Sequence, residues 1–173
     1  MKKYQILKWF VLAIAVAINL FILVNAFING EASAKESNDI AHTTADVINT
    51  VKPETITPQN FDKFAFNLRK VVGHFLLFAF SGVFSTWSFY LFLKDRKLGY
   101  FVWQLCFTFA LGFSLALITE FAQIFVEGRT GAWADVGIDS LGYFIGVLPV
   151  ILILLLRKSP IFQKPKNKKN QAE

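Results

Sequence analysis

The sequence predicts an all-α membrane protein with four transmembrane helices and an outer amphipathic helical loop between the first and second spans. The chain has 173 residues, of which 54% are hydrophobic, and its mean hydropathy is +0.46. Its apolar residues are gathered in four long runs that carry almost no charge. A run of about 18 or more apolar residues is long enough for a helix to cross a bilayer. The basic residues lie between and beside these runs, in a pattern typical of membrane topology.

The four runs define the expected organisation of the chain. A basic N-terminus (residues 1–8) precedes the first span (9–28), and an outer loop (29–70) connects it to the second. A core of three spans then occupies residues 71–156, with the spans at 71–93, 100–118 and 136–156, and a basic tail (157–173) follows. The tail is polar and we expect it to be disordered.

The first span has two interpretations. Its basic start, apolar run and the small-residue segment Ala32–Ala34 resemble a cleavable signal peptide. However, an apolar run of about 20 residues exceeds the usual hydrophobic region of a signal peptide, which is roughly 7–15 residues long. We therefore favour an uncleaved membrane anchor, with cleavage as the alternative.

The outer loop contains a helical pattern. Apolar residues recur at helical spacing at Ile40, Ala41, Ala45, Ile48 and Val51, which predicts an amphipathic helix on the outer membrane face. The prolines in the segment 52–58 end this helix. After them, a helical period from residue 61 to residue 71 predicts a lead-in helix that continues into the second span.

The formal net charge of +6 reflects topology rather than nucleic-acid binding. Twelve of the 18 Lys and Arg residues lie at the two termini and between the second and third spans, and six lie in the other two loops. Positive residues accumulate on the cytoplasmic side, so we expect both termini in the cytoplasm of a multi-pass protein of the cell membrane. We expect contact with membrane lipids and none with nucleic acid. The single cysteine, Cys106, allows no internal disulfide.

Polar residues from three segments gather at one end of this topology, just below the outer surface. Helical spacing places Lys70 and His74 on one face of the second span, and Glu120 and Gln123 on one face of the third. One face of the fourth span carries two acids and two glycines, which are Asp135, Asp139, Gly142 and Gly146. The loop before this span contributes a cation, Arg129. This pattern predicts a polar pocket with close helix packing beneath it, in which Lys70 and Arg129 are the nearest partners for Glu120 and Asp139.

Several of these residues also fit a purely structural role. Asp135 could cap the fourth helix, since an acid is stabilised near a helix N-terminus. Gly142 and Gly146 fit plain helix packing, and His74 fits an interfacial histidine that is satisfied by hydrogen bonds. Glu120 and Asp139 are harder to explain in this way, because ionisable residues flanked by apolar ones in a membrane segment are functional candidates by default.

These residues resemble the motifs of the VanZ-like family of bacterial integral membrane proteins. The segment "RKVVGHF" is similar to the Lys–His pair of that family, with Lys and His four residues apart instead of the more usual three. A later block matches the pattern E-x-x-Q, G-R and D-x-x-x-(N or D)-x-x-G-x-x-x-G, with Asp139 where many members have asparagine. The outer segment "GEASAKES" also resembles the serine-bearing segment of the family. The resemblance implies a link to low-level resistance to the glycopeptide teicoplanin, and no defined reaction.

Two functions follow as hypotheses. In the first, the pocket binds a lipid-linked envelope precursor, a glycopeptide or another anionic ligand, with Lys70, Gln123, Arg129 and Asp135 as ligand-binding residues. In the second, the protein is a membrane-embedded enzyme acting on a lipid head group or cell-wall precursor, with His74, Glu120 and Asp139 as catalytic residues. The two carboxylates would act as base or as ligands to a divalent cation.

No segment has a diagnostic metal-ligand spacing, so the sequence assigns no metal. It also assigns no cofactor and no oligomeric state. A transporter is less favoured, since there is no internal repeat.

Overall fold

The computed structural model describes residues 2–93 and 98–158, and these form helices joined by short loops with no strand among them. The chain begins with α1 (Lys2–Ala26) and α2 (Gly30–Val51). A continuous helical segment follows, made of α3 (Phe61–Arg69), the π-helix η1 (Lys70–Leu76) and α4 (Leu77–Leu93). The last two helices are α5 (Leu98–Gln123) and α6 (Trp133–Lys158).

Among the residues that the structure describes, four helical segments are long and apolar enough to cross a membrane, as the sequence predicts. They are Lys3–Ala26, Phe61–Leu93, Val102–Gln123 and Trp133–Leu156. The second is the longest at 33 residues, because the lead-in helix α3 runs without a break through η1 into α4. A helix rises about 1.5 Å per residue, so this segment exceeds the roughly 30 Å hydrocarbon core and extends beyond it. The protein is therefore an all-α, multi-pass membrane protein.

The four spans pack side by side around α4, which contacts α1, α5 and α6. The bundle core combines Ile22, Phe78, Leu115, Tyr143 and Val147, and most of the remaining large apolar side chains face outward. An outward apolar surface suits a lipid environment, where the hydrophobic effect does not drive helices together and close packing must do so.

Glycines on α4, α5 and α6 allow this close packing. A Cβ added to Gly142 would collide with the backbone of Phe75, and one added to Gly146 would collide with the backbone of Ala79. On the opposite side of the same interface, Gly82 of α4 lies against the backbone of Tyr143 on α6. Since η1 and α4 meet α6 at backbone contact, side chains near the crossing are held at short range.

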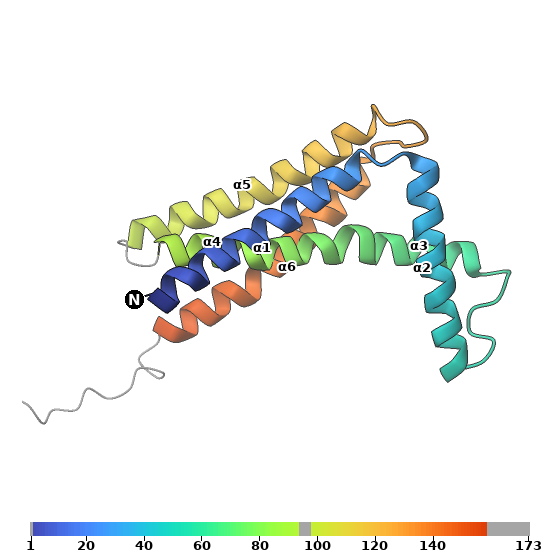
Figure 1. Cartoon of the computed structure of the whole chain (residues 1–173), viewed down its shortest axis with the longest axis horizontal. Helices are drawn as coiled ribbons and strands as arrows, with labels where there is room; N and C mark the ends of the chain where they lie inside the picture. Colours follow the sequence, from blue (N-terminus) through green and yellow to red (C-terminus); the bar gives the residue numbers. More distant parts are fainter. Residues whose placement is uncertain (1, 94–97, 159–173) are drawn as a thin grey trace, which may run out of the picture.

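The start of α1 and the end of α6 lie at one end of the bundle, and α2 and α3 lie at the other (Figure 1). At that end α2 projects across the direction of the spans rather than along it (Figure 1). It is a 22-residue helix that ends at Val51, before Pro53, as the proline signal predicts. Ala41 and Ala45 of the predicted stripe are buried, whereas Ile40 and Val51 are exposed. The predicted tail at 159–173 and the loop residues 94–97 lie outside the described residues.

Candidate functional site

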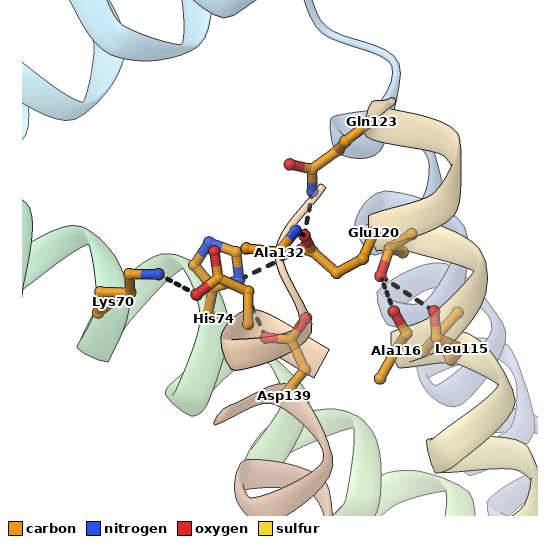
Figure 2. Close-up of polar contacts among 10 residues, drawn as sticks. Lys70, His74, Leu115, Ala116, Glu120, Gln123, Ala132 and Asp139 are labelled. Carbon is orange, nitrogen blue, oxygen red and sulfur yellow. Dashed lines mark hydrogen bonds and ion pairs between the residues drawn. The ribbon is translucent and has the colours of Figure 1, made fainter. Parts of the chain in front are cut away.

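Three ionisable side chains from three helical segments meet at the end of the bundle near α2. His74 of η1 places its Nδ1 atom 3.0 Å from Oδ1 of Asp139 on α6. The same Nδ1 lies 4.0 Å from Oε1 of Glu120 on α5. Glu120 is 3% exposed and Asp139 is 1% exposed, so the two carboxylates are removed from solvent. Figure 2 shows the imidazole on one side of the two acids, with a contact drawn from it to each carboxylate.

Local backbone structure places His74 in this position. Residues Lys70–Leu76 form a π-helix, whose wider turn changes the direction of side chains relative to an α-helix. Single π-helical turns inside α-helices are rare and occur often at functional sites. Within the segment, Lys70 and His74 both face α6, where they meet Asp135 and Asp139. Farther along the same helical segment, polar side chains contact α1 instead: Ser81 donates a hydrogen bond to Oδ1 of Asn19, and Ser85 accepts one from the Asn19 amide.

Backbone and amide donors fix the orientation of Glu120. Its Oε2 accepts a hydrogen bond of 3.0 Å from the backbone N–H of Ala132, and its Oε1 accepts one of 3.1 Å from the Gln123 side chain (Figure 2). The backbone of Gly131 also packs so closely on the backbone of Glu120 that an added Cβ would collide with it. These contacts hold the loop between α5 and α6 against Glu120.

A second ion pair lies at the edge of the cluster. The Lys70 ammonium contacts Oδ1 of Asp135, and both side chains are largely buried. Asp135 is also in the first turn of α6, where the helix dipole favours an acid. This pairing differs from the sequence-based expectation, which assigned Lys70 and Arg129 to Glu120 and Asp139. Among the described residues, His74 is the one basic side chain within 4.0 Å of those two carboxylates.

Arg129 is positioned by the contact between the α5–α6 loop and the start of α2. Gly128 has a φ of +74°, a conformation that favours glycine. It lies against Gly30, whose backbone N–H donates a 2.9 Å hydrogen bond to the carbonyl of Glu127. The Nε atom of Arg129 is buried and has no hydrogen-bond partner within the described chain. Burial, together with the nearby Arg69 guanidinium, lowers the pKa of Arg129 from its ordinary value.

Four of these residues, His74, Gln123, Arg129 and Asp139, border a cavity of about 220 Å³ that lies between α1, α2, α3, η1, α4, α5 and α6. One part of its wall is polar and includes Arg69, His74, Gln123, Arg129 and Asp139. The serines of the sequence "GEASAKES", Ser33 and Ser37, also line it. The rest of the wall is apolar and is formed by side chains of α1, α2, α3, η1 and α4: Phe21, Ile22, Ala26, Ile40, Leu68, Val72, Leu77 and Phe78.

A second cavity, of about 330 Å³, lies on the other side of Glu120. Its wall is almost entirely apolar and includes Phe121, Ile124, Trp133 and Val136. Glu120 is therefore bordered by the second cavity, while its partners His74 and Asp139 border the first.

The structure brings the predicted site residues to one end of the bundle. Of these, Gly142 and Gly146 lie below the site, where α6 crosses η1 and α4. Three further residues line the cavity and were not predicted from the sequence: Arg69, Ser33 and Ser37. Arg69 was counted only as a loop cation, although it immediately precedes Lys70 and lines the cavity. Ser33 and Ser37 were noted only for their resemblance to a family segment. Four-residue spacing within "SAKES" was the available signal, because it places both hydroxyls on one helix face.

Comparison with known proteins gives one family. A family model described as VanZ/LLP1 matches residues 9–156, which include most of the first span, the other three spans and every residue of the site. Searches of the curated proteins and of the solved structures returned no match.

Proposed function

The chain belongs to the VanZ/LLP1 family, and on this premise we propose that it binds the anionic head group of a lipid-linked ligand in the 220 Å³ cavity. The observation that carries this proposal is the buried Nε of Arg129, which has no hydrogen-bond partner within the described chain. An unsatisfied buried donor on a cation costs free energy, and a phosphate or carboxylate would satisfy it. Arg69 lines the same cavity and supplies a second guanidinium.

The two kinds of cavity wall match an amphipathic ligand. Arginine binds phosphate and carboxylate through a planar fork of N–H donors, which suits a head group. Phe21, Leu77 and Phe78 line the cavity from two membrane spans, and they suit an acyl or isoprenoid chain. A ligand that holds its charge at Arg129 and its chain between α1 and α4 would be a component of the membrane itself.

Topology completes the proposal. The positive-inside distribution orients the end that bears α2 toward the outer face of the cell membrane, with both termini in the cytoplasm. The ligand would then be met at the outer interface, where lipid-linked envelope precursors and lipid-bearing glycopeptides are found. Family membership supports a link to teicoplanin resistance, since teicoplanin carries a fatty acyl chain and an interfacial pocket is a suitable place to bind it.

A catalytic function is the second candidate, and one contact favours it. The Nδ1 of His74 faces Asp139 at 3.0 Å, an arrangement that orients an imidazole and leaves its Nε2 for proton transfer. In that case a lipid head group or cell-wall precursor bound at Arg129 would be the substrate.

Binding can be tested with the purified full-length protein in nanodiscs of phosphatidylcholine that contain small, equal fractions of phosphatidic acid and diacylglycerol. We expect native mass spectrometry to show retention of phosphatidic acid in preference to diacylglycerol. Arg129→Ala should weaken this preference roughly tenfold or more, because charge-assisted hydrogen bonds contribute about 1.5–3 kcal/mol. Lys35→Ala, at an exposed cation of α2, is the matched control. Equal retention by wild type and Arg129→Ala would contradict the proposal.

A cell-based assay separates binding from catalysis. Teicoplanin susceptibility and envelope lipid composition would be measured in cells that express wild type, Arg129→Ala or Asp139→Asn at matched levels. A binding protein should lose its effect in a graded way, with Arg129→Ala the most affected. Complete loss in Asp139→Asn, with accumulation of one lipid species, would favour the enzyme.

A further inference from the structure

We propose that His74, Glu120 and Asp139 form a binding site for a divalent transition-metal ion. One donor atom from each residue lies within 4.8 Å of the others. The donors come from η1, α5 and α6, so they are far apart in sequence and show no metal-ligand spacing. The inference goes beyond anion binding at Arg129, because a metal ion could bind whether or not the head group does.

The distances fit a shared ion. Metal–ligand bonds of about 2.0–2.2 Å place adjacent donor atoms roughly 3–3.6 Å apart in octahedral and tetrahedral sites, and opposite donors of an octahedral site roughly 4–4.4 Å apart. The Nδ1 of His74 is 3.0 Å from Oδ1 of Asp139 and 4.0 Å from Oε1 of Glu120. Small side-chain rotations would bring the three donors around one ion. The bound imidazole would be neutral with its proton on Nε2: an imidazolium would release its Nδ1 proton to water, and a neutral Nδ1–H tautomer would move that proton to Nε2.

Charge balance is an independent argument for a cation. Asp135 is paired with Lys70, whereas Glu120 and Asp139 share the single imidazole of His74. Even a protonated imidazole supplies one positive charge for two carboxylates that are 3% and 1% exposed. An uncompensated carboxylate is costly in a water-poor interior, and a divalent ion would neutralise both acids.

The surroundings have two further properties of a metal site. The hydrogen bonds from Ala132 and Gln123 hold the Glu120 carboxylate, as outer-shell donors hold ligating carboxylates elsewhere. His74 and Asp139 line the 220 Å³ cavity, so coordination positions on that side are open to a further ligand. A phosphate held by Arg129 could reach the ion from there.

The donor set selects the kind of ion. Imidazole suits Zn²⁺ and other first-row transition metals, whereas Mg²⁺ and Ca²⁺ prefer sites made only of oxygen. One imidazole and two carboxylates therefore favour Zn²⁺ or Mn²⁺. Both ions should be tested, since their affinities in such a mixed set differ with geometry.

The test is metal binding by the chelator-treated full-length protein in detergent or nanodiscs. We expect equilibrium dialysis with Zn²⁺ or Mn²⁺, followed by elemental analysis, to give about one ion per chain. Glu120→Gln and Asp139→Asn should each lower the affinity by roughly 10–100-fold or more, since outer-shell changes alone have effects of that size. Glu127→Gln, at an exposed acid of the α5–α6 loop, should bind as wild type does.

Two outcomes would overturn the inference: substoichiometric binding of both ions by the wild type, or wild-type affinity in both Glu120→Gln and Asp139→Asn. X-ray absorption of the metal-loaded wild type provides a second measurement, which does not depend on the folding of a variant. It should show nitrogen and oxygen ligands that include about one imidazole. Binding that survives in Arg129→Ala would separate this site from the proposed head-group site.

Discussion

The Nδ1 of His74 and Oδ1 of Asp139 lie 3.0 Å apart, although the residues are 65 positions apart in the sequence. This contact joins η1 to α6 one turn above the place where Gly142 meets the backbone of Phe75. The site is therefore built on a close helix crossing, so its geometry depends on packing as well as on the polar residues themselves.

The first prediction concerns the energy of this pair. In a double-mutant cycle with His74→Gln and Asp139→Asn, we expect a coupling of about 1.5–3 kcal/mol, the range for hydrogen bonds to charged groups. The measurement is reversible unfolding in detergent micelles. The matched cycle pairs His42→Gln with Asp139→Asn; His42 stacks on Phe61 at a ring distance of 4.1 Å, so its effect should be additive. Additivity in the His74 cycle would mean that the contact contributes nothing to stability.

The second prediction concerns the helix crossing. Gly146→Ala should destabilise the protein by about 1–3 kcal/mol, because the new Cβ collides with the backbone of Ala79 and the helices must separate. Gly137→Ala on the same helix has open space around the new Cβ and should be neutral or stabilising by up to about 1 kcal/mol. Thermal unfolding of both variants checks this, and equal melting temperatures would show that the crossing is looser than described.

The third prediction concerns the flanking ion pair. Lys70→Met keeps the aliphatic stem but leaves the largely buried Asp135 without its cation, and we expect a loss of about 1–3 kcal/mol. Asp135→Asn added to Lys70→Met should recover part of this loss. Lys63→Met, at an exposed lysine of α3, should change stability by less than about 0.5 kcal/mol. A similar effect of the two lysine variants would show that the pair is not formed.

The fourth prediction tests how Arg129 is held. Gly30→Ala places a Cβ against the backbone of Gly128, so the α5–α6 loop must move away from α2. We expect weaker retention of phosphatidic acid, in the direction of Arg129→Ala, while the transmembrane bundle keeps its melting temperature within a few degrees. Unchanged retention would mean that the loop position does not control the head-group site.

Much of the fold could be predicted from the sequence because lipid imposes simple constraints on a chain. The four spans follow from apolar runs, and the end of α2 follows from Pro53. The lead-in helix before the second span also follows from a helical period, since residues from 61 to 93 form one unbroken helical segment. Each of these signals is local, and the number of conformations available to a chain in a membrane is small.

The pairing within the site could not be predicted in the same way. The helical spacing and topology predict that the polar residues lie at one end of the bundle. The same pattern predicts Lys70 and Arg129 as the nearest partners of Glu120 and Asp139. Lys70 instead pairs with Asp135, and His74 contacts Asp139. The π-helix that directs both side chains toward α6 has no sequence signal of its own. Arg129 is placed by a contact between Gly128 and Gly30, which only the tertiary structure reveals.

Whether His74 and Asp139 meet inside the helix bundle can be measured by ¹⁵N NMR of the protein with selectively labelled histidine. The chain has two histidines, so His42 serves as an internal reference. In metal-free protein, we predict that Asp139→Asn changes the Nδ1 shift and tautomer of His74 and leaves His42 unchanged. Identical His74 spectra in wild type and Asp139→Asn would contradict the account.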